Sequence, residues 1–169
     1  MRVELVPIDL SAAPVLARLM QLYAYDFSEI MGIDISDEGL FAAPDVQQYF
    51  GAAFRHPFLV RTDGHLAGFV IVDEQSRFGN QDAPLDVAEF LVLRRHRGAG
   101  VGRTVAEAIF SRFRGKWEVR QVMKNVAATA FWRRVIDRYT AGAFEETLFD
   151  DERWRGPVQR FDNRTLQER

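Results

Sequence analysis

The chain has 169 residues, of which 47% are hydrophobic and 27% are charged, and its formal net charge is −2 at pH 7. This length and apolar content suffice for a hydrophobic core, so we expect one domain over residues 1–169. The near-neutral charge argues against a protein that coats nucleic acid. The absence of cysteine excludes disulfides, thiolate zinc sites and a cysteine nucleophile.

No apolar run approaches the roughly 18–20 residues of a membrane-spanning helix, and the N-terminus lacks the pattern of a signal peptide. We therefore expect a cytoplasmic protein with no membrane partner.

The first half of the chain predicts a strand, two helices and a hairpin. Val3–Val6 is a short apolar stretch, and Ser11 can cap a helix whose apolar residues recur at helical spacing. After a loop, Asp45–Phe54 again places apolar residues on one helical face, which predicts a second helix. Phe58–Arg61 and Leu66–Val72 flank an Asp-Gly turn signal, which predicts an antiparallel hairpin.

The second half alternates strands with helices. Ser76–Pro84 is a polar loop, and Val87–Leu93 is an apolar run interrupted by Glu89, as expected of a central strand covered on both faces. The remaining elements are a helix from Gly98–Gly102 to near Gly115, a strand over Trp117–Met123, a helix capped by Asn125, and strands over Phe144–Phe149 and Val158–Phe161. This order predicts an α/β fold, or α+β on stricter definitions, with helices on both faces of a mixed sheet.

A segment rich in glycine and arginine follows the central strand. Gly98, Gly100 and Gly102 let backbone N–H groups approach an anion without obstruction by Cβ atoms. The helix that starts here adds the positive end of its dipole. Arg97 and Arg103 can add charge-assisted hydrogen bonds. The segment is therefore predicted to bind a phosphate or pyrophosphate group.

Two other kinds of phosphate loop do not match this segment. The Walker loop needs a longer spacer between its glycines and then a lysine, whereas Arg103 follows Gly102 here. The dinucleotide fingerprint needs one more spacer residue and an initial strand, whereas Gly98–Gly102 lies late in the chain. A nucleotide triphosphatase and a Rossmann dehydrogenase are both disfavoured.

The pattern that remains, Arg95-x-x-Gly98-x-Gly100, resembles motif A of the GNAT superfamily of N-acetyltransferases. Asn125-x-x-Ala128-x-x-Phe131-Trp132 is similar to motif B of that family and follows the next strand. The resemblance covers Val87 to about Phe149 by motif. It implies a mixed, mostly antiparallel central sheet of about six to seven strands flanked by about four helices.

The resemblance also implies that acetyl-CoA is the acyl donor. The backbone of Leu91, Val92 and Leu93 would bind the acetyl carbonyl and the pantetheine. Asn125, Phe131 and Trp132 would flank the pantetheine, although capping and core packing also account for these three residues. The pyrophosphate would contact Arg97, Gly98, Ala99, Gly100, Val101, Gly102, Arg103 and Thr104.

Direct acyl transfer needs a base that takes a proton from the amine, and Glu89 is the candidate. A carboxylate desolvated in an apolar strand has a raised pKa, which suits a base, but pairing with an arginine would also explain it. Many family members have a tyrosine acid where this chain has Trp132, whose indole cannot serve as that acid. The proton on the leaving thiolate would then come from Tyr139 or water, or the thiolate would leave unprotonated.

The acceptor is expected to bind near the end of the first helix, where the family forms its acceptor cleft. Tyr23, Tyr25, Asp26 and Glu29 lie there and suit an amine, although core packing and solvation also explain them. We expect direct transfer to a primary amine of a small molecule or peptide in a ternary complex. A non-catalytic acyl-CoA sensor is the alternative, since Trp132 replaces the usual acid. The exposed final strand would permit a homodimer.

No metal is expected in this site. His56, His65 and His96 fall before a strand, in a turn and in the glycine-rich loop, without the paired spacing of metal ligands.

Overall fold

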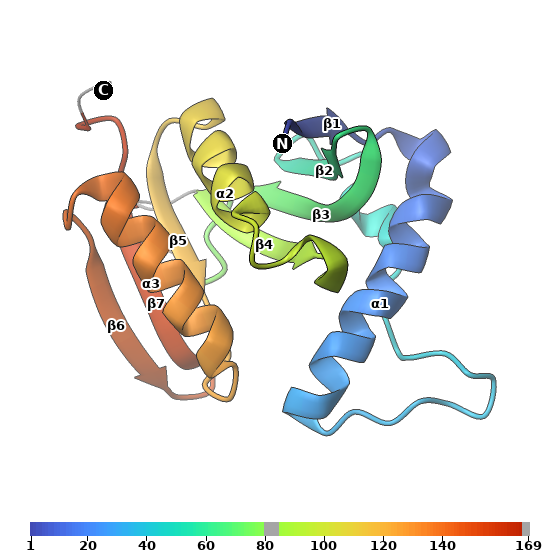
Figure 1. Ribbon diagram of the computed structural model, residues 1–169. Coiled ribbons are helices and arrows are strands. Elements are labelled where there is room, and N and C mark those ends of the chain that lie inside the picture. The colour runs from blue at the N-terminus through green and yellow to red at the C-terminus, as the bar shows by residue number, and fades with distance from the viewer. Residues whose placement is uncertain (80–84, 167–169) are drawn as a thin grey trace.

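The computed structural model describes residues 1–79 and 85–166, and residues 80–84 of the predicted polar loop lie outside them. The described strands form one sheet in the order β1-β2-β3-β4-β5-β7-β6 (Figure 1). The described residues form three α-helices, not the four that were expected. The elements are β1 (Val3–Pro7), α1 (Ala13–Met31), β2 (Arg55–Thr62), β3 (His65–Asp73), β4 (Leu85–Val92), α2 (Val101–Arg112), β5 (Lys116–Arg120), α3 (Val126–Thr140), β6 (Glu145–Asp150) and β7 (Arg155–Asp162).

The helices cover opposite faces of the strands β2–β4. Along β3, Phe69 and Ile71 pack in the cluster that contains buried residues of α1, whereas Val70 and Val72 pack in the cluster that contains residues of α2 and α3. This alternation is the period of two that a strand covered on both faces requires. Within the described residues, no helix is long and apolar enough to cross a membrane.

The predicted helix over Asp45–Phe54 is wrong. The structure has only the 3-10 turn η2 (Val46–Tyr49), which begins where the Asp45 carboxylate accepts a hydrogen bond from the amide of Gln47 at 2.9 Å. Phe50 already has extended backbone, and Gly51 then takes a positive φ of 82°, so the chain does not continue as a helix before β2 begins. The turn still buries Tyr49, which is 5% exposed, and this burial directs its hydroxyl toward β4.

The start of α1 also differs from the prediction. Asp9, rather than Ser11, is the capping residue, and it caps the 3-10 turn η1 (Leu10–Ala12) that precedes α1. Its carboxylate accepts a hydrogen bond from the amide of Ser11 at 2.9 Å. Aspartate is as good a cap as serine, and here it lies two residues earlier.

The β2–β3 hairpin is confirmed. Asp63 and Gly64 form its turn with φ values of 48° and 82°, the left-handed pair that matches the twist of the strands. Further along β3, a Cβ atom on Gly68 would lie 1.9 Å from the carbonyl oxygen of Leu91. Glycine is therefore required where β3 passes β4.

The sheet consists of two antiparallel halves joined by a short parallel contact. Strands β1–β4 form one half, and β5, β7 and β6 form the other. Between β4 and β5 the paired residues are Leu85 with Trp117 and Asp86 with Glu118. Beyond Asp86 the two strands are no longer paired, so β4 has an open edge from Val87 onward.

Candidate active site

The open edge of β4 exposes particular backbone amides. The amide of Leu93 donates to the carbonyl of Ala67 at 2.8 Å, so it faces β3. Because amides alternate along a strand, that of Leu91 also faces β3, while those of Phe90 and Val92 face the open edge. Of the three predicted backbone positions, Val92 therefore directs its amide toward the open edge, whereas Leu91 and Leu93 direct theirs toward β3. The amide of Phe90 also faces the open edge, and this residue was not among the predicted positions.

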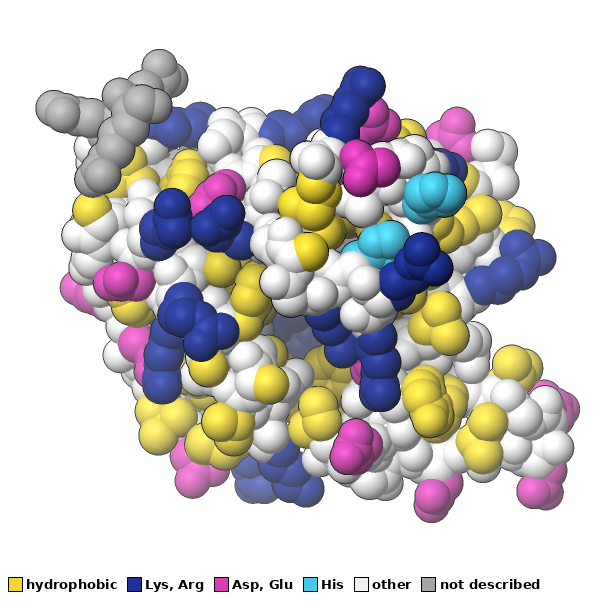
Figure 2. All heavy atoms as spheres, viewed as in Figure 1, with side chains coloured by type: hydrophobic (Ala, Val, Ile, Leu, Met, Phe, Trp, Pro, Cys, Tyr) yellow, Lys and Arg dark blue, Asp and Glu magenta, His cyan; other side chains and the backbone are white. Residues whose placement is uncertain are grey.

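A cleft of about 290 Å³ lies along this open edge. In the view of Figure 2, the surface between α1 and α3 is hollowed, and Lys and Arg side chains border the hollow. One wall comes from α1 and β4, and the other from β5, the segment after it, and α3. The lining residues are Tyr23, Phe27, Arg77, Val87, Ala88, Glu89, Phe90, Val119, Arg120, Gln121, Val122, Asn125, Ala128, Trp132 and Trp154.

Glu89 lies in this cleft close to two tyrosines. The hydroxyl of Tyr49 donates to its carboxylate at 3.3 Å, and Tyr23 lines the same cleft. Burial raises the pKa of Glu89 above its ordinary value, and the tyrosine hydroxyls and the charge of Arg120 oppose this rise. Burial also raises the pKa of both tyrosines, so both stay neutral donors.

Glu89 forms no salt bridge with a described residue. The alternative explanation for this carboxylate, pairing with an arginine, is therefore not observed among the described residues. The nearby Arg120 instead bonds to Asp86, and their side chains are 9% and 4% exposed. Burial, opposed by Arg120, raises the pKa of Asp86 to about 6. The carboxylate of Glu89 is therefore left available to a ligand in the cleft.

The glycine-rich loop leads from the end of β4 into α2. Gly98 and Gly100 have φ values of 78° and 86°, which other residues rarely adopt. Among the described residues, the amides from Gly98 through Arg103 donate to no backbone carbonyl. A helix N-terminus with free amides is suited to bind an anion. At Gly102, a Cβ atom would lie 3.2 Å from the ring of Phe131, so this glycine lets α2 and α3 pack closely.

Two arginines of this loop bond to a carboxylate of α1. The guanidinium groups of Arg94 and Arg97 both bond to the carboxylate of Asp26, the former at 2.9 Å. Arg97 also donates through Nε to the carbonyl of Val92 at 2.6 Å. Arg103 lies 3.9 Å from Glu107 on the next turn of α2, and the Thr104 hydroxyl donates to the carbonyl of Gly100 at 3.2 Å. Asp26, predicted to contact the acceptor, thus joins α1 to the loop.

The predicted residues of α3 lie across the cleft from β4. Asn125 caps the helix, and its side-chain oxygen accepts from the amide of Ala128 at 3.1 Å. Trp132 is 5% exposed and lies 4.9 Å from the ring of Phe90, with which it makes an edge contact. Phe131 also contacts Phe90, at 5.9 Å. Capping and packing are thus observed for these residues, and Asn125 and Trp132 line the cleft as well.

Tyr139, Tyr25 and Glu29 are among the predicted residues that lie outside the cleft. Tyr139 packs on Phe110 and Phe161, at ring distances of 5.2 and 6.2 Å. Tyr25 is 59% exposed, and Glu29 is also exposed on α1. Of the predicted acceptor residues, the structure places Tyr23 beside Glu89.

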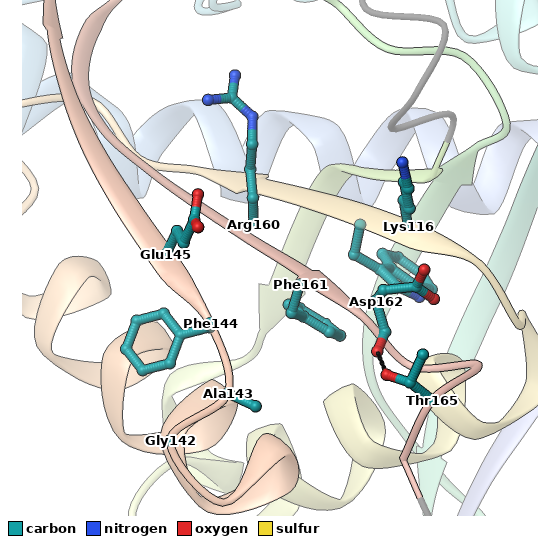
Figure 3. A pocket seen from close by; sticks show the side chains of 10 residues that line it. Lys116, Gly142, Ala143, Phe144, Glu145, Arg160, Phe161, Asp162 and Thr165 are labelled. Carbon is teal, nitrogen blue, oxygen red and sulfur yellow. Dashed lines mark hydrogen bonds between the residues drawn. The ribbon is translucent and has the colours of Figure 1, made fainter.

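A second depression, of about 640 Å³, lies at the opposite end of β5. Figure 3 shows Phe144 and Phe161 among the side chains that line it, and the Thr165 hydroxyl donates to the carbonyl of Asp162 at 3.1 Å. It starts at Lys116, whereas the cleft reaches Arg120 and Gln121 at the other end of this strand. It is therefore separate from Glu89 and the glycine loop.

Several residues of the site were not predicted from the sequence. Among them are Tyr49, which bonds to Glu89, and Arg77, Arg120 and Trp154, which line the cleft. Tyr49 appeared only as an apolar position of a helix, and Trp154 lies in a polar segment between two strands. No sequence motif identifies these residues, because only tertiary packing brings them to the cleft or to Glu89. Among the described residues, no group of three or more His, Cys, Asp or Glu could hold a metal ion.

Comparison with known proteins agrees with this geometry. The sequence model of the acetyltransferase (GNAT) family matches residues 17–136. No curated protein matched the chain.

Solved structures share the fold across nearly the whole chain. An acetyltransferase from Thermus thermophilus is 19% identical, with a TM-score of 0.67 and coverage of 95% of this chain and 96% of that one. An aminoglycoside acetyltransferase in complex with coenzyme A is 14% identical, with a TM-score of 0.59 and coverage of 96% of both chains. The GNAT domain of an S. lividans protein is 20% identical, with a TM-score of 0.57, and covers 95% of this chain and 89% of that one. With its family match, its split sheet and its glycine loop between β4 and α2, this chain belongs to the GNAT family of acetyltransferases.

Proposed function

We propose that this protein transfers an acetyl group from acetyl-CoA directly to a primary amine of a small molecule or peptide. The observation that carries the proposal is Glu89, a partly buried carboxylate without a salt bridge among the described residues, on the open edge of β4. Two similar structures are described by their amine ligands or substrates, one as a complex with ribostamycin and coenzyme A and one as a spermidine N-acetyltransferase. An amine acceptor is consistent with an acidic group in the cleft.

The donor would lie along the open edge of β4. The free amides from Gly98 through Arg103 suit the pyrophosphate, and the amides of Phe90 and Val92 suit the pantetheine and acetyl carbonyl. Asn125 and Trp132 would border the pantetheine from α3. Acetyl-CoA supplies an activated acyl group as a thioester.

Glu89 would accept the proton that the amine loses when its nitrogen attacks the acetyl carbonyl. Its raised pKa makes it a stronger base than an exposed glutamate, and the hydrogen bond from Tyr49 holds its carboxylate in place. Trp132 offers no acidic proton at the thiol, and Tyr139 packs elsewhere. The coenzyme A thiolate can leave unprotonated or take a proton from water, since a thiol pKa of about 8.5 makes it a tolerable leaving group.

Two measurements test this proposal. Calorimetry with acetyl-CoA should give saturable binding, and a panel of primary amines should give release of free thiol that depends on the amine. Failure of folded protein to bind acetyl-CoA would contradict the proposal. Binding without thiol release for any amine would instead favour a sensor of acyl-CoA.

A further inference from the structure

We propose that the acceptor carries a carboxylate beside its amine, so that an amino acid, rather than a simple amine, is the class of substrate that fits this cleft. This inference rests on the proposed function. It follows from the positions of two opposite charges in the cleft, Glu89 and Arg77, neither of which has an ion-pair partner among the described residues.

Arg77 is a cation at the cleft that pairs with no carboxylate among residues 1–79 and 85–166. It is exposed and lines the cleft, and it forms no hydrogen bond or salt bridge within the described part of the chain. Its guanidinium carbon lies 5.5 Å from the ring centre of Trp154, a cation–π contact. The indole of Trp154 is fixed in turn, because its N–H donates to the carbonyl of Gln121 at 3.1 Å.

A second guanidinium group strengthens the positive potential at the part of the cleft where Trp154 lies. Arg120 lies 5.4 Å from the same indole, also in cation–π contact. Asp86 neutralises Arg120, but the Nε atom of Arg120 is buried without a hydrogen-bond partner among the described residues. Trp154 therefore keeps two guanidinium groups near each other, and Arg77 is the one whose charge is not compensated within the described part of the chain.

The charge of Arg77 acts on Glu89 without pairing with it. Arg77 is among the charges that lower the pKa of Glu89, yet no salt bridge joins the two. The cleft thus presents a carboxylate and a separate guanidinium to the same ligand. A zwitterion complements both, with its amine at Glu89 and its carboxylate at Arg77.

The phosphates of coenzyme A do not account for Arg77. The glycine loop follows the C-terminal end of β4, whereas Arg77 precedes the N-terminal end of that strand. Leu93, where the loop begins, lies four residues after Glu89, which is about 13 Å along a strand. Arg77 and Glu89 both line the cleft, whereas no residue of the glycine loop does.

The walls of the cleft favour an aromatic or other apolar side chain on this acceptor. Tyr23, Phe27, Trp132 and Trp154 all line it. L-Phenylalanine and phenethylamine are therefore a suitable pair of probes, since they differ by the carboxylate alone.

The experiment compares kcat/KM for the two probes at one pH, corrected for the fraction of neutral amine. We expect a preference of about 10- to 100-fold for L-phenylalanine, the size of a charge-assisted hydrogen bond. Arg77→Gln should abolish the preference by raising the KM for L-phenylalanine, and Arg77→Lys should keep part of it. Arg153→Gln, a matched change in the exposed loop that holds Trp154, should leave it intact.

Three outcomes would overturn the inference while leaving acyl transfer in place. They are equal turnover of both probes, a preference that survives Arg77→Gln, or an Arg77→Gln variant that loses affinity for acetyl-CoA instead of for the amino acid. Calorimetry with N-acetylphenylalanine and N-acetylphenethylamine, with coenzyme A present, tests the same preference without turnover. Tighter binding of the acid supports the inference, and equal binding overturns it.

Discussion

Replacing Glu89 with glutamine removes a proton acceptor while preserving the shape of the side chain. The oxygen of the new amide can still accept the hydroxyl of Tyr49, which lies 3.3 Å from the carboxylate in the native protein. The substitution should therefore leave the fold and the affinity for acetyl-CoA unchanged. Loss of a general base typically costs about 10²- to 10⁴-fold in rate, or about 2.7–5.4 kcal/mol in barrier height. We expect kcat to fall by that factor.

The pH dependence gives a second signature of the same group. Only the ionised form of Glu89 accepts a proton, so kcat should fall as the pH falls through its pKa. Burial raises that pKa above the ordinary value of 4.5, which moves the decline toward neutral pH. The Glu89→Gln variant should lack this decline.

The assay is thiol release at saturating acetyl-CoA and acceptor, measured across pH, with calorimetry for donor affinity. Glu38→Gln provides the control, because Glu38 is exposed in the loop after α1 and the chemical change is the same. An unchanged kcat in the Glu89 variant would refute the role of Glu89 as the base. A fall of kcat at low pH that persists in the Glu89→Gln variant would also refute this role.

Three further substitutions test the binding loop and the packing. Gly100→Glu should abolish acetyl-CoA binding in calorimetry, because φ is 86° and a carboxylate would enter the anion site; retained affinity would place the pyrophosphate elsewhere. Phe110→Ala should lower the free energy of unfolding in urea by about 3–5 kcal/mol, since Phe110 is fully buried and contacts Trp117 at 4.9 Å; a loss under about 1 kcal/mol would contradict this packing. Gly68→Ala should cost about 1–3 kcal/mol or more, because its Cβ would meet the carbonyl of Leu91, and unaltered stability would show that β3 can move away.

Local signals predicted much of this fold. The Asp63-Gly64 turn needs positive φ at both positions, so its residues identify the hairpin. The prediction of a helix over Asp45–Phe54 failed because apolar spacing alone cannot show that the chain becomes extended at Phe50 and takes a positive φ at Gly51. Its apolar face was nevertheless meaningful, since Tyr49 is buried.

The site was predictable in part. The glycine loop and the cap at Asn125 depend on residues that are close in sequence, and both follow the prediction. Glu89 stood out as a charge in an apolar strand, but its bond to Tyr49 spans 40 positions and depends on how η2 packs on β4. The contacts of Asp26 with Arg97 and of Arg77 with Trp154 could not be predicted either, because these partners are also far apart in the sequence.

The short parallel contact between β4 and β5 has a consequence for how the molecule responds to force and to local opening. Two residue pairs form that backbone junction, whereas each half of the sheet has longer ladders of its own. The backbone junction between the two halves is therefore narrow, and a shared core cluster supplies the rest of the contact between them. The amides of Phe90 and Val92, on the open edge beyond this junction, should exchange hydrogen readily in the free protein. Acetyl-CoA bound to β4, α2 and α3 together would bridge the two halves of the sheet. It would raise the free energy needed to separate them locally and slow the exchange of these amides.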